Sequence, residues 1–168
     1  KWFLGVLIMA VRNYRELSSI LQKIAERFLA NQNLCKVLYY TDEKPLSHTD
    51  FSSTKSLLGD VIRFTPRVGA QETTKCILVM SLIGGSRDAR NKEILVLPVQ
   101  FYLYVPYAQW VIEGDELRPF LLMSYIDETL DGKSIGGIGT LRSVDFQLDS
   151  ITDEMCCYRM GYTIDLFK

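Results

Sequence analysis

The residues from 92 to 130 constrain the fold of this chain more than any other segment. Residues 94–105 are a long apolar run that predicts a strand, and residues 115–130 then follow the pattern of an amphipathic helix. Pro98 lies inside the strand and lacks a backbone N–H, which indicates an edge position or a bulge. We expect the other segments to pack against this strand and helix or to pair with them.

Start and stop signals define the second helix and the elements around it. Pro119 suits the first turn and Gly132 follows the last turn. One face is predicted to carry Phe120, Leu121, Tyr125 and either Ser124 or Glu128. The remaining expected elements are a helix at residues 13–30 and strands at residues 34–40, 61–64, 76–83, 143–148 and 156–166, the last two as an antiparallel hairpin. The sum is an α+β fold, with a mostly antiparallel sheet of about five or six strands packed against two helices.

Length and charge limit the functional classes. With 168 residues the chain has the size of one domain, and we expect an apolar N-terminal arm at residues 1–11 before an α+β core at residues 12–168. A formal net charge of -1 argues against a protein that binds nucleic acid through its phosphates. The arm carries Trp2, Phe3 and Leu4 and is too short to span a bilayer, so it favours a protein partner and no membrane.

The cysteines and the histidine predict no metal site. Because no Cys-x-x-Cys pair is present, the four cysteines are interpreted as reduced, packed thiols. With His48 as the single histidine, a zinc site would need carboxylates or scattered cysteines. The cysteines are Cys35, Cys76, Cys156 and Cys157.

Glycine-rich patterns predict no cofactor either. Gly132, Lys133 and Ser134 resemble the end of a phosphate-binding loop, but that loop needs a glycine where this chain has Asp127. The glycines at residues 136–139 lack the preceding strand and following helix of a dinucleotide site. A helix end and a flexible entry to the hairpin are the favoured interpretations.

The polar stretch at residues 41–59 predicts a long loop, and loops of that length are usually functional or flexible. His48 and Asp50 supply the residue types of a base and its orienting carboxylate. Neighbours in one loop seldom form a catalytic site, so a solvated connector is favoured. The hydroxyl groups that a catalytic interpretation would use belong to Ser47, Ser52 and Ser53.

Aromatic residues gather in and after the long strand. They lack interleaved basic residues, so core packing or a protein interface is favoured over base stacking. The residues are Phe101, Tyr102, Tyr104, Tyr107 and Trp110.

The order of these elements resembles one family. An N-terminal amphipathic helix, a polar loop containing Pro45, the strand through residues 94–104, the segment at residues 110–119 and a closing hairpin occur in turn. In this order, over roughly residues 13–167, the chain resembles the tail terminator and tail-completion proteins of tailed bacteriophages.

The resemblance implies a small structural subunit rather than an enzyme. Such subunits form a ring, commonly a hexamer, at the head-proximal end of the tail, where the ring ends tube polymerisation and joins the tail to the neck. The implied partners are further copies of the chain, the tail tube protein and a neck or head-closure protein, with DNA only as cargo. The implied location is the virion, after assembly in the host cytoplasm.

Several residues are candidates for contacts within such a particle. The acidic turn with Asp149, Asp153 and Glu154 would repel DNA phosphates if it faced the channel of a ring. The candidate interface residues are Trp2, Phe3, Leu4, His48, Asp50, Arg87, Arg90 and Trp110. Two alternatives stay open: a head-closure or other neck connector protein, and a small enzyme or ligand-binding domain that uses the His48 loop.

Overall fold

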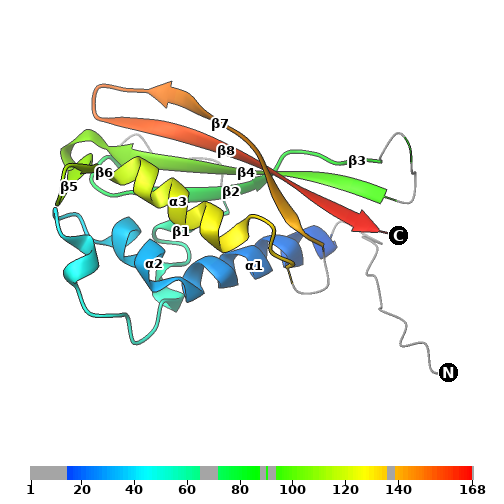
Figure 1. Cartoon of the computed structure of the whole chain (residues 1–168), viewed down its shortest axis with the longest axis horizontal. Helices are drawn as coiled ribbons and strands as arrows, with labels where there is room; N and C mark the ends of the chain where they lie inside the picture. Colours follow the sequence, from blue (N-terminus) through cyan, green and yellow to red (C-terminus); the bar gives the residue numbers. More distant parts are fainter. Residues whose placement is uncertain (1–14, 65–71, 88–89, 91–93, 136–138, 168) are drawn as a thin grey trace.

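The computed structural model describes residues 15–64, 72–87, 90, 94–135 and 139–167 (Figure 1). The helices are α1 (Arg15–Ala30), α2 (Gln32–Tyr39) and α3 (Arg118–Leu130). The strands are β1 (Ile62–Arg63), β2 (Ile77–Leu82), β3 (Ser86–Arg87), β4 (Ile94–Pro106), β5 (Val111–Ile112), β6 (Glu116–Leu117), β7 (Leu141–Ile151) and β8 (Met155–Phe167). The predicted α+β class with a mostly antiparallel sheet is confirmed.

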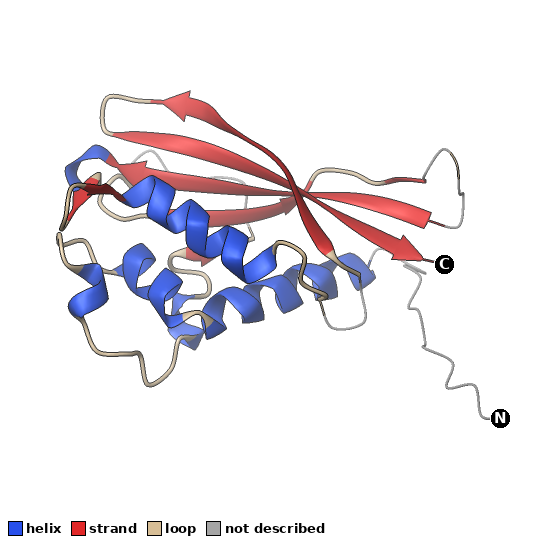
Figure 2. Cartoon of the chain, viewed as in Figure 1, coloured by secondary structure: helices blue, strands red, loops and turns tan. Residues whose placement is uncertain are grey.

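The long apolar strand lies in the middle of the main sheet. The strand order is β1-β2-β4-β8-β7, with β3 also paired to β4, and β5 and β6 form a separate small sheet. Every pair in the main sheet is antiparallel except β1 with β2. Figure 2 shows the helices gathered beside one face of this sheet. The prediction that other segments pair with and pack against β4 is therefore confirmed.

The core forms where the helices meet β4. Phe101 of β4 is fully buried, and its ring lies edge-on to Phe28 of α1 at 5.4 Å and to Tyr162 of β8 at 5.3 Å between centroids. Leu122 and Ile126 of α3 are buried in the same cluster. One aromatic side chain thus joins the first helix, the central strand and the closing hairpin.

Pro98 does not lie at a sheet edge or a bulge, contrary to the prediction. It pairs with Thr163 of β8 in a regular register. Ile83 N donates to Pro98 O at 3.4 Å on the opposite side, where β2 has ended at Leu82. Since the N and C=O of one residue in an antiparallel strand point to the same neighbour, the nitrogen of Pro98 faces the gap between β2 and β3. The proline is tolerated because no ladder bond is required there.

The predicted strand at residues 34–40 is wrong, because residues 34–39 belong to helix α2 and Tyr40 caps its end. Asn31 caps the helix, and its side-chain oxygen accepts a hydrogen bond from Leu34 N at 3.1 Å. A short apolar run fits a buried helix as well as a strand, so periodicity alone could not decide. The buried side chains are Leu34, Cys35, Lys36, Val37 and Leu38.

The predicted face of the second helix is only partly correct, because Leu121 and Tyr125 pack against the core but Phe120 does not. Phe120 is 44% exposed, whereas Leu122, Met123, Ile126 and Leu130 are buried. Apolar residues surround the first two turns of this helix, so spacing does not determine which of them meets the sheet. The predicted helix at residues 13–30 is confirmed from Arg15 onward, and Asn13 lies outside the described residues.

Candidate functional site

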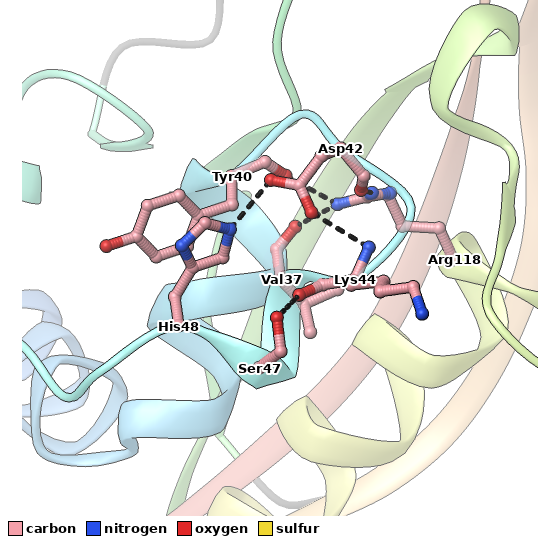
Figure 3. Close-up of polar contacts among 7 residues, drawn as sticks. All are labelled: Val37, Tyr40, Asp42, Lys44, Ser47, His48 and Arg118. Carbon is pink, nitrogen blue, oxygen red and sulfur yellow. Dashed lines mark hydrogen bonds and ion pairs between the residues drawn. The ribbon is translucent and has the colours of Figure 1, made fainter.

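The loop at residues 41–59 is attached to the core by Arg118, the first residue of α3 (Figure 3). This guanidinium is fully buried. Its Nε donates to Gln109 O at 2.7 Å, and its Nη1 donates to Val37 O at 2.8 Å and to Tyr40 O at 2.7 Å. Its Nη2 donates to Asp42 O. Arg118 therefore satisfies carbonyls at the C-terminal end of α2, where the helix dipole favours a cation.

His48 lies on the surface of this anchored loop. Its Nε2 is 2.8 Å from Asp42 Oδ2, and its ring stacks on Tyr40 with centroids 3.7 Å apart. Lys44 N donates to Asp42 Oδ1 at 2.8 Å, while Ser47 Oγ donates to Lys44 O at 2.7 Å and so turns away from the imidazole (Figure 3). The arrangement orders the loop by a carboxylate–imidazole pair and a ring stack.

The carboxylate beside His48 is not the one that the sequence suggested. Asp50 instead forms an ion pair with Lys36 of α2, with 2.6 Å between Lys36 Nζ and Asp50 Oδ1. The Lys36 side chain is almost fully buried up to its amine, so this pair holds the far part of the loop against α2. His48 and Asp50 therefore do not form the pair that a catalytic interpretation would need, which agrees with the favoured prediction of a connector loop.

The hydrogen bond with His48 lowers the pKa of Asp42 below its ordinary value of 3.8. A carboxyl with a depressed folded-state pKa stabilises the protein above its unfolded-state pKa, and this stabilisation is lost as the pH falls through the folded-state value. We expect Asp42→Asn to reduce slightly the dependence of the free energy of unfolding on pH between about pH 5 and pH 2. The effect is small because the carboxylate is half exposed.

Urea unfolding at a series of pH values measures this effect. His48→Phe keeps a ring over Tyr40 and removes the imidazole, so it should reproduce the Asp42→Asn profile, whereas the exposed neighbour variant Glu43→Gln should not. If Asp42→Asn and the wild type showed the same dependence of stability on pH, the Asp42–His48 pair would not be the source of this stabilisation.

The cysteines are buried and free, as predicted. Burial raises the pKa of Cys35 and Cys156 to about 11 and that of Cys76 and Cys157 to about 12. Thiolates are the nucleophilic and metal-binding form, so these side chains act as packing groups near neutral pH. Within the described ranges, no three His, Cys, Asp or Glu side chains are grouped to hold a metal ion.

An apolar surface lies uncovered along β7, at the edge of the main sheet. Phe146 pairs with Met160 and Leu148 with Tyr158, so both side chains point to the face of the sheet that carries the core. Phe146 is nevertheless 63% exposed and Leu148 46% exposed. Figure 1 shows why: β7 begins beside the end of α3, but its second half runs toward the hairpin turn and away from α1 and α2.

Helix α3 extends this surface. The ring centroids of Phe120 and Tyr158 are 5.6 Å apart. Tyr158 is the cross-strand partner of Leu148. Ile151, at the end of β7, pairs with Cys156 and is 65% exposed. We call this set the hairpin surface: Phe120, Phe146, Leu148, Ile151 and Tyr158.

Comparison with known protein families decides the relationship of this chain. The model of the YomW family matches residues 31–164, from the cap of α2 to the end of the closing hairpin. The chain belongs to the YomW family. The family is phage-associated, which agrees with the phage resemblance of the sequence. No curated protein matches the sequence.

In this YomW-family protein the other predicted contact residues are scattered. Trp110 is half-buried near the hairpin surface, with its ring 6.4 Å from Tyr158. Arg87 lies in β3, and Arg90, between β3 and β4 in the chain, is exposed. The acidic residues Asp149, Asp153 and Glu154 are exposed at the tip of the β7–β8 hairpin, and Trp2, Phe3 and Leu4 lie outside the described residues. None of the described helices combines the length and apolar character that crossing a membrane requires.

Sequence reasoning missed the hairpin surface, although its signal was present. Alternating apolar residues in β7 correctly indicated one apolar face and an antiparallel hairpin. Alternation does not reveal whether the same chain supplies the layer that covers that face. In this YomW-family protein the helices leave it open.

Proposed function

We propose that this YomW-family protein is a structural subunit of a phage particle that forms a closed ring at the head-proximal end of the tail. The ring ends polymerisation of the tail tube and joins the tail to the neck. The phage association of the family and the order of elements described above support this proposal. The protein would act in the virion after assembly in the host cytoplasm.

The observation that carries the proposal is the hairpin surface. Large exposed apolar patches on a folded subunit mark protein contacts, because leaving them in water is unfavourable. Aromatic and aliphatic side chains without charges also typify the centre of an oligomer interface. The ion pair between Asp145 of β7 and Arg159 of β8, at 2.8 Å, lies on the opposite face of the sheet.

The partners in this proposal are other copies of the chain, the tail tube protein and a neck or head-closure protein. DNA would pass through the ring as cargo. The acidic tip with Asp149, Asp153 and Glu154 would repel phosphates if it faced the channel. A head-closure or other neck connector ring is the alternative placement within the same class of structural protein.

We infer a structural role for His48 in this function. The stack on Tyr40 and the bond with Asp42 shape the loop at residues 41–59, which we propose as a contact with neighbouring subunits or the tube. The alternative of a small enzyme is tested by His48→Ala: lost activity on a small substrate with intact assembly would favour it.

Native mass spectrometry of the purified protein over a concentration series tests the ring directly. We expect a discrete closed oligomer, six subunits above all, rather than a continuous ladder of species. Adding this oligomer to the tail tube protein of the same phage should limit tube length in electron micrographs. A strict monomer at every concentration, with no effect on tube length, would contradict the proposal.

A further inference from the structure

We propose that the hairpin surface of one subunit packs head-to-tail against a second apolar patch, at the β1 edge, of another copy of this chain. This inference rests on the proposed function and names the surfaces that would close the ring. The β1-edge patch consists of Leu58 and Phe64, which are 39% and 38% exposed.

The two patches lie at opposite ends of the strand order. β7 ends the main sheet on one side and β1 ends it on the other. Leu58 forms a bridge with Ile62 of β1, and Phe64 directly follows that strand. Two different apolar patches on opposite sides of a subunit suit a heterologous contact, which closes into a ring when the rotation per subunit allows it.

The backbone of β7 limits the other arrangement, in which two β7 edges pair with each other. Ser143 N already donates to Asp131 Oδ1 at 2.8 Å. The register with β8 shifts between Ser143 and Asp145 and again between Leu148 and Ser150. The longest stretch of regular pairing in β7 is therefore residues 145–148. Bulges bend a strand and blunt its edge for further pairing. Side-chain packing is therefore the better use of this surface.

The size of the hairpin surface also favours a macromolecular partner. Four of its side chains, those of Phe120, Phe146, Leu148 and Ile151, are 44–65% exposed and offer on the order of 400 Å² of apolar area. A stable protein interface buries about 800 Å² on each partner, with an apolar centre and a polar rim. The hairpin surface has the size of such a centre, and a second copy supplies an apolar patch to meet it.

Two variants and their mixture test the proposal in the full chain. Phe146→Asp places a charge in the hairpin surface, and Phe64→Asp places one in the β1-edge patch. We expect each variant alone to weaken self-association about 100-fold and to remain monomeric by native mass spectrometry. The control Ile83→Asp alters an apolar residue that is 53% exposed and belongs to neither patch, so it should assemble like the wild type.

Mixing the two variants gives the sharpest result. Each retains one intact patch of a different kind, so an equimolar mixture should form a one-to-one heterodimer and no ring. All three variants should retain the circular dichroism spectrum of the wild type, because the substituted side chains are exposed in the subunit. A variant that unfolds is replaced by Leu148→Ser for the hairpin surface or Leu58→Ser for the β1-edge patch.

The outcomes separate this inference from the proposed function. A wild-type ring that survives both Phe146→Asp and Phe64→Asp overturns the inference and leaves the ring intact. Assembly lost in Phe146→Asp but normal in Phe64→Asp also overturns it, because the hairpin surface would then meet something other than the β1 edge. A wild-type protein that forms open chains through both patches, without closing, upholds the inference and contradicts the ring.

Discussion

Replacing Arg118 with methionine is expected to lower the free energy of unfolding by about 3–5 kcal/mol. The guanidinium donates to the backbone carbonyls of Gln109, Val37, Tyr40 and Asp42 in a fully buried setting. Methionine fills much of the volume but leaves those acceptors without donors. Equilibrium unfolding in urea, followed by circular dichroism, measures the loss.

The matched control for this variant is Lys133→Met, which makes the same kind of change at an exposed position beyond the end of α3. It should change the free energy of unfolding by less than about 0.5 kcal/mol. Amide hydrogen exchange gives a second measurement, because the loop at residues 41–59 should lose protection in Arg118→Met before the sheet does. A loss below about 1 kcal/mol would contradict the anchoring role of Arg118.

Truncating Phe101 to alanine is expected to lower the free energy of unfolding by about 3–5 kcal/mol. Its ring contacts Phe28 and Tyr162, so truncation opens a cavity where α1, β4 and β8 meet. The surrounding elements come from distant parts of the chain and cannot all move in to fill that space. Thermal and urea unfolding of the purified variant measure the cost.

Phe146→Ala provides the matched control for Phe101→Ala, because the same truncation at an exposed site should change subunit stability by less than about 0.5 kcal/mol. Both are best measured in the Phe64→Asp background, so that self-association does not contribute. Equal losses for the two truncations would show that the Phe146 ring is covered within the subunit, which would contradict the description of the hairpin surface.

The sequence by itself determined the elements whose signals are long and unambiguous. The apolar run of β4, the period of α1 and the alternation in β7 and β8 predicted the right element types and the antiparallel hairpin. The polar stretch at residues 41–59 was correctly predicted as a loop, and its regular structure is confined to two short 3-10 turns. Long periodic segments are reliable because many residues repeat the same preference.

The tertiary structure decided whatever depends on contacts between distant residues. The run at residues 34–38 became helix because Asn31 caps it and α1 and α3 cover it. Phe120 turned outward because α3 buries Leu122 and Ile126 instead. Arg118 could not be recognised as an anchor, since its acceptors lie as far as 81 residues away in the chain.

The same reason explains the hairpin surface. Alternation in β7 identifies an apolar face, but whether that face is buried depends on how far the helices reach across the sheet. The helices cover the start of β7, where Leu141 is buried, but not its hairpin half, so Phe146 and Leu148 stay in water although their neighbour Met160 is buried. Local preference determined the strand, and the reach of the helical layer decided that its apolar face is left for a partner.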